Sequence, residues 1–136
     1  MGKINWGRVF LCGIVTWGIS FLLNFALFVF AVGETEFAAV RQADRPTITW
    51  VRASCTFAVG IWTMWLYAAI RPRYGPGPKT AAMAGVALWV IAALAAVLWV
   101  SSGLTTISLG ALLVPLVAAL PTIIVGTLAG AWLYKE

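Results

Sequence analysis

The sequence predicts an all-α integral membrane protein, a four-helix bundle that forms a single transmembrane domain over residues 1–136. Hydrophobic residues make up 62% of the chain and charged residues 10%, whereas soluble domains have about 45–50% and about 25%. Four apolar stretches are each long enough to cross a bilayer core, which takes about 20 helical residues. Nine basic and four acidic side chains are too few to cover a soluble core of this size. We therefore exclude a soluble enzyme and a nucleic-acid-binding protein.

The residues between the apolar stretches support a division into four spans. Gly33, Glu34 and Glu36 end the first stretch with two charges. This apolar stretch is longer than the apolar region of a signal peptide, which has about 7–15 residues. We therefore expect the stretch to remain in the protein as an uncleaved first span. Prolines and glycines in 71–79 end the second stretch, because neither continues a helix well. Gly103 follows the third and supplies the positive φ common just past a helix end. The predicted spans are 9–32, 50–70, 80–100 and 109–134.

The segment between the first two spans is the longest predicted loop. Residues 35–42 predict a short amphipathic helix, because Phe37, Val40 and Arg41 share one helix face at positions i, i+3 and i+4. Such a helix lies in the membrane interface, with its basic side chain among the headgroups. A connector on the membrane surface is favoured over a docking or gating element.

Basic residues are distributed unevenly between the two sides of the predicted bundle. Six Lys or Arg residues lie on the side of the termini and the 71–79 loop, and three lie on the other side. The positive-inside rule therefore predicts that both termini are cytoplasmic. Aromatic and basic side chains near the span ends are expected to anchor the helices at the interfaces. These are Trp6, Arg8, Arg71, Arg73, Trp132 and Tyr134 on the inner side, and Trp50 and Arg52 on the outer side.

A polar stripe runs along the first span, where Cys12, Thr16, Ser20 and Asn24 recur every four residues on one helix face. Asn24 is the most costly of them in lipid, because its amide needs partners where no water is near. We therefore expect it to face another helix. A helix–helix hydrogen bond, worth about 0.6–2 kcal/mol in membranes, is favoured over a substrate or ion pathway.

The fourth span carries a second stripe at the same spacing. Its two glycines form a GxxxG motif, which lets a neighbouring helix approach closely but does not indicate which one. Pro115 and Pro121 predict a kink in this span, because each removes a backbone N–H. A merely bent helix is favoured over a hinge or ligand site. The stripe consists of Ala118, Thr122, Gly126 and Gly130.

Side chains that support chemistry are scarce. The chain has no histidine, its two cysteines lie far apart in the sequence, and no acidic residue lies inside a predicted span. This pattern argues against a metal or haem site and against proton-coupled transport, and no base is present to activate a hydroxyl. We predict no catalytic, cofactor or metal site. Trp17, Trp62 and Trp89 are expected to fill the core, with a bound lipid, quinone or pigment as the alternative.

Three strings resemble a group of small four-helix bacterial inner-membrane proteins of unknown function: Ile4-Asn5-Trp6-Gly7-Arg8, Asn24 in the first span, and Gly130-Ala131-Trp132-Leu133-Tyr134-Lys135. The resemblance implies a multi-pass protein of the bacterial inner membrane and provides no functional residues. Together with the small-residue stripes, it leads us to expect a non-catalytic membrane subunit, in a homo-oligomer or a complex with other membrane subunits, and in contact with membrane lipids. A channel or transporter for a small neutral or lipid-like solute is the alternative, and an enzyme of lipid chemistry a weaker one.

Overall fold

The described residues form four α-helices and no strand: α1 (Trp6–Ala43), α2 (Pro46–Tyr74), α3 (Pro78–Ser101) and α4 (Leu109–Leu133). The computed structural model describes the backbone of residues 4–43, 46–103 and 109–134, and the side chains of 4–27, 30, 50, 53–103, 113 and 115–134. Each helix contains a stretch long and apolar enough to cross a membrane, as the composition predicts. These stretches are Trp6–Leu27, Ala53–Tyr74, Pro78–Ser101 and Pro115–Leu133.

Helix α1 is longer than the predicted span of residues 9–32. The helix continues without interruption to Ala43, so residues 35–42 are its last turns rather than a separate helix. A glycine in a helix costs only about 1 kcal/mol, and no proline occurs before Pro46. With 38 residues at about 1.5 Å each, α1 exceeds a bilayer core of about 30 Å. The side chains of residues 35–42, and with them the predicted amphipathic face, lie outside the described residues.

The end of α2 also differs from the prediction. The helix continues through Pro72 and ends at Tyr74, although the prolines of 71–79 were expected to stop it. A proline in the last turn removes one hydrogen bond but does not prevent the helical conformation of its neighbours. The chain turns at Gly75, whose φ of +83° favours glycine. Thr80 holds this turn, because its hydroxyl donates a hydrogen bond to the Gly75 carbonyl at 2.8 Å.

The other helix ends follow the local sequence closely. Asn5 precedes α1, and its side-chain oxygen accepts a hydrogen bond from the Arg8 backbone N–H at 3.2 Å, as a helix N-cap does. Pro78 is the first residue of α3, a position that suits its fixed φ. Helix α3 ends at Ser101, and Gly103 has a φ of +73°. The prediction that this glycine follows the helix end is confirmed.

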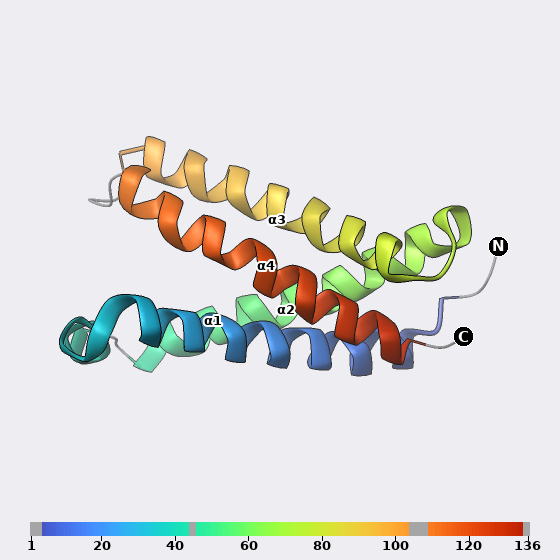
Figure 1. Ribbon diagram of the computed structural model, residues 1–136, viewed down its shortest axis with the longest axis horizontal. Helices are drawn as coiled ribbons and strands as arrows, with labels where there is room; N and C mark the ends of the chain where they lie inside the picture. The colour runs from blue at the N-terminus through green and yellow to red at the C-terminus, as the bar shows by residue number, and fades with distance from the viewer. Residues whose placement is uncertain (1–3, 44–45, 104–108, 135–136) are drawn as a thin grey trace.

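Helix α4 packs between α3 on one side and α1 on the other. Helix α1 also packs against α2, and α2 contacts α3 less extensively. Within the described residues α1 and α3 do not contact each other. The helices approach one another closely where α1 begins and α4 ends, and α3 lies away from α1 and α2 at the opposite end (Figure 1).

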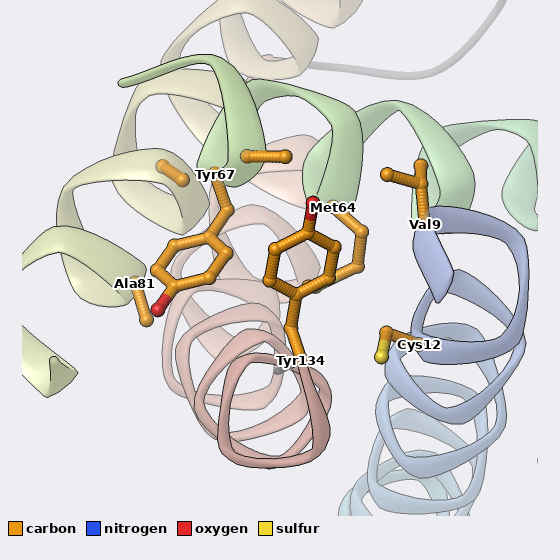
Figure 2. Packing of buried hydrophobic residues seen from close by; sticks show 8 residues of the cluster. Val9, Cys12, Met64, Tyr67, Ala81 and Tyr134 are labelled. Atoms are coloured by element: carbon orange, nitrogen blue, oxygen red, sulfur yellow. The ribbon is translucent and has the colours of Figure 1, made fainter. Parts of the chain in front are cut away.

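The buried core therefore lies at the end where the helices converge. It takes side chains from α1, α2 and α3 and from Tyr134, which follows α4. Figure 2 shows the rings of Tyr67 and Tyr134 together in this core, with Val9 and Cys12 contributed by α1. The two tyrosine rings meet edge to face at 5.9 Å, a favoured arrangement for aromatic pairs. The core residues are Val9, Cys12, Met64, Tyr67, Ala68, Ala81, Ala84 and Tyr134.

Candidate functional site

The two polar and small-residue stripes lie against each other, in what we call the α1–α4 interface. It consists of Cys12, Thr16, Ser20 and Asn24 from α1 and Thr122, Gly126 and Gly130 from α4. Gly130 lies beside Cys12 and Thr16, Gly126 beside Thr16 and Ser20, and Thr122 beside Ser20 and Asn24. Residue numbers rise on α1 as they fall on α4, so the helices run antiparallel. Ala118, the remaining residue of the second stripe, is half-buried one turn further along α4.

The glycines of α4 permit this close approach. A Cβ atom at Gly126 would lie 2.8 Å from the Thr16 carbonyl oxygen and would overlap the Ser20 hydroxyl. A Cβ atom at Gly130 would lie 2.9 Å from the Cys12 carbonyl oxygen and would overlap the Thr16 hydroxyl. Because backbone atoms cannot rotate away as side chains do, the GxxxG motif sets the separation of the two helices. The neighbour that the sequence left open is therefore α1.

The side-chain amide nitrogen of Asn24 donates two hydrogen bonds. Its Nδ2 donates to the Thr122 hydroxyl oxygen at 2.6 Å and to the Ser20 carbonyl at 2.9 Å. The Thr122 hydroxyl donates in turn to the Ala119 carbonyl at 2.7 Å, and the Ser20 hydroxyl donates to the Thr122 carbonyl at 3.2 Å. These contacts join α1 to α4 through side-chain and backbone groups. They satisfy the donors that would otherwise be costly in a membrane.

Thr16 differs from its neighbours in the interface. Its side chain is 3% exposed, and its hydroxyl makes no hydrogen bond with any group in the described part of the chain. The hydroxyl occupies the space in front of Gly130. Thr16 therefore contributes shape to the interface, whereas Asn24 and Ser20 contribute hydrogen bonds.

A second close contact, between α1 and α2, was not anticipated from the sequence. A Cβ atom at Gly13 would lie 2.7 Å from the Ile61 Cα, and one at Gly60 would lie 2.8 Å from the Gly13 carbonyl oxygen. Nearby, the indole N–H of Trp17 donates to the Thr56 hydroxyl at 3.1 Å. Gly13 and Gly60 lie in no GxxxG pair, so no spacing pattern identified them. Their only signal was glycine inside a helix, which is unfavourable without a packing reason.

Helix α4 remains continuous through both of its prolines, since Pro115 and Pro121 lie within Leu109–Leu133. Between them, the Leu116 carbonyl accepts a hydrogen bond from the indole N–H of Trp89 at 2.9 Å. Trp89 thus attaches α3 to α4 at this point. This arrangement agrees with the packing role expected for it. Trp62, by contrast, is exposed and lies 4.9 Å from the Trp65 ring.

The predicted anchor residues occupy different environments. Trp6, Trp50 and Trp132 are exposed, as is Arg73, whereas Arg8 and Arg71 are half-buried. Tyr134 is 4% exposed and packs against Tyr67 in the core. The Tyr134 ring therefore faces the bundle, whereas the rings of the three tryptophans are exposed on its surface. The side chain of Arg52 lies outside the described residues.

Groups able to hold a metal do not gather in the described part of the chain, where no three Cys, Asp or Glu side chains come together. Cys12 is buried and Cys55 exposed, and both are free thiols. Comparison with protein-family models, with curated proteins and with solved structures finds no match.

Proposed function

We propose that the protein is a non-catalytic integral membrane subunit that packs with copies of itself or within a larger membrane complex. Four helices able to cross a membrane support multi-pass insertion. The excess of basic residues on the side of the termini favours a topology with both termini in the cytoplasm. The proposed location is the bacterial inner membrane.

The observation that carries the proposal is the state of Asn24. In a solute pathway a polar side chain faces a water-filled cavity, whereas both donors of the Asn24 amino group are held by Ser20 and Thr122. The glycines beside it bring the two helix backbones into contact. The polar stripe therefore joins α1 to α4, which supports a packing role over a solute pathway.

A second feature supports packing against further helices. Only 22–28% of the residues in each spanning stretch are fully buried, so the remaining residues have surface that can contact lipid or partner helices. On the exposed face of α1, Gly18 lies one turn from each of the exposed residues Ile14 and Leu22. A Cβ atom at Gly18 would meet nothing within 4 Å. A small residue flanked by large apolar ones allows a second helix to approach closely.

The test is the composition of the assembly in native membranes. We expect extraction in a mild detergent, followed by light scattering and native mass spectrometry, to reveal a homo-oligomer or a complex of defined stoichiometry. Gly18→Leu is expected to lower the oligomer fraction or the partner yield, because leucine fills the open position. Ala95→Leu is the matched control, an enlargement of an exposed small residue on α3.

A monomer without a stoichiometric partner would contradict the proposal. Transport of a small neutral or lipid-like solute is the competing outcome, and it has its own signature. Asn24→Leu would then abolish solute flux in vesicles while the melting temperature stayed nearly constant.

A further inference from the structure

An open cavity of about 500 Å³ lies at the convergent end of the bundle. It is formed where α2 ends, the chain turns into α3, and α4 ends, and these segments all lie at the right-hand end of Figure 1. Its volume is in the range of about 300–1,000 Å³ typical of small-molecule sites. The cavity is lined by the aromatic rings Tyr67, Trp132 and Tyr134, the cation Arg71, the turn residues 76–78, and Leu128 and Ala131.

Arg71 is the cation of this cavity, and a buried ring holds it in place. Its guanidinium carbon lies 5.5 Å from the centroid of the Tyr134 ring, within the distance of a cation–π contact. Tyr134 is positioned by Tyr67, and both rings are almost fully buried. A guanidinium donates hydrogen bonds in its plane, and this geometry suits planar recognition of a phosphate.

The charge around the cavity favours an anion. Among the described residues at this end of the protein, Arg8, Arg71, Arg73 and Lys79 are basic and none is acidic. Clusters of this kind on the cytoplasmic side attract anionic headgroups. Trp132 is 81% exposed and contributes an amphipathic ring, which prefers the depth of the headgroups. Leu128 and Ala131 add apolar surface on the side of the spanning helix.

We propose that this cavity binds the phosphate headgroup of an anionic phospholipid. Arg71 pairs with the phosphate, the exposed ring of Trp132 lies beside the headgroup, and one acyl chain lies along α4 beside Leu128. The chemistry of the lining matches such a ligand at both ends, since it combines one cation with apolar walls. The site goes beyond the subunit role proposed above and does not depend on it.

The experiment is a lipid titration of the whole purified protein in a neutral detergent. The probes are phosphatidylglycerol, phosphatidylcholine with the same acyl chains, and inorganic phosphate. We expect phosphatidylglycerol to raise the melting temperature saturably and native mass spectrometry to count one retained lipid per chain. Phosphatidylcholine is expected to bind about five- to tenfold more weakly, because it carries no net charge for the cation to attract.

Two pairs of variants locate the site. Arg71→Gln is expected to lower phosphatidylglycerol affinity about five- to tenfold, whereas Arg73→Gln, with the same change of charge two residues later, leaves it within about twofold. Trp132→Ala is expected to lower the affinity without changing any charge. Its control is Trp6→Ala, which removes another exposed tryptophan outside the cavity lining. Since Trp132 is exposed, this second pair tests the site even where Arg71→Gln impairs folding.

Three results would overturn the proposal. Equal losses in Arg71→Gln and Arg73→Gln would indicate a diffuse surface charge rather than a site. Equal retention of the two phospholipids would show that the net negative charge of the headgroup has no role, because both lipids carry the phosphate. Full stabilisation by inorganic phosphate alone would assign the cavity to a free anion instead of a lipid.

Discussion

Asn24 donates two hydrogen bonds in the α1–α4 interface, so its removal leaves both the Ser20 carbonyl and the Thr122 hydroxyl without this donor. We expect Asn24→Ala to lower the free energy of unfolding by about 0.5–2 kcal/mol, the range measured for hydrogen bonds between membrane helices. Asn24→Leu should cost at least as much, because both variants leave the Thr122 hydroxyl without its donor and leucine leaves less room for a water to replace it. Unfolding in mixed detergent, followed by circular dichroism, measures both changes.

A double-mutant cycle separates the Asn24–Thr122 bond from general packing. The effects of Asn24→Ala and Thr122→Val should be non-additive, because each variant removes the same hydrogen bond. Thr63→Val is the control partner, since the Thr63 hydroxyl donates only within its own helix, to the Val59 carbonyl. Additive effects in the Thr122 cycle would show that the 2.6 Å contact contributes nothing of its own.

Thr16 leads to the opposite expectation for a similar substitution. Thr16→Val keeps the shape of the side chain and removes a buried hydroxyl that makes no hydrogen bond in the described part of the chain. The variant should be neutral or more stable by up to about 1 kcal/mol, because an unsatisfied buried polar group carries a desolvation penalty. The same unfolding assay measures it. A loss comparable to that of Thr122→Val would mean that the Thr16 hydroxyl has a partner.

At the scale of the helices, the glycines of α4 determine how closely α1 and α4 pack. Gly126→Ala and Gly130→Ala should each destabilise the protein by about 1–3 kcal/mol, the usual cost of overpacking, because the added carbon meets backbone oxygens of α1. Gly7→Ala is the control, since a Cβ there makes only an ordinary contact of 3.6 Å. Equal melting temperatures for all three variants would show that the two helices are not held at this separation.

At the scale of the whole molecule, the predicted orientation is testable with single cysteines. In a background with Cys12→Ala and Cys55→Ala, Pro76→Cys should react with a membrane-impermeant maleimide only from the cytoplasmic side. Ala43→Cys should react only from the opposite side. Both expectations follow from the excess of basic residues near the termini and the α2–α3 turn. Labelling with the two sides exchanged would invert the topology and move the proposed lipid site to the outer leaflet.

Much of the architecture could be predicted because it depends on local sequence. The number of helices follows from apolar stretches of membrane length, and the end of α3 follows from Gly103. The stripes containing Asn24 and Gly126 were visible because a four-residue spacing keeps side chains on one helix face. The need of Asn24 for a partner also followed from the sequence, since an amide in lipid requires one.

Other features were decided only by the tertiary structure. A stripe defines a face but not its neighbour, so the pairing of α1 with α4, and of Gly13 with Gly60, depends on which helices meet. Helix α1 continues past Gly33 and α2 through Pro72, because their local penalties are small. The Tyr134 ring packs in the core, since Tyr67 and Arg71 lie beside it. In each case the sequence determined the local preference. Contacts between residues far apart in the chain selected the outcome, because tertiary packing contributes more free energy to a helix than the local propensity of one turn does.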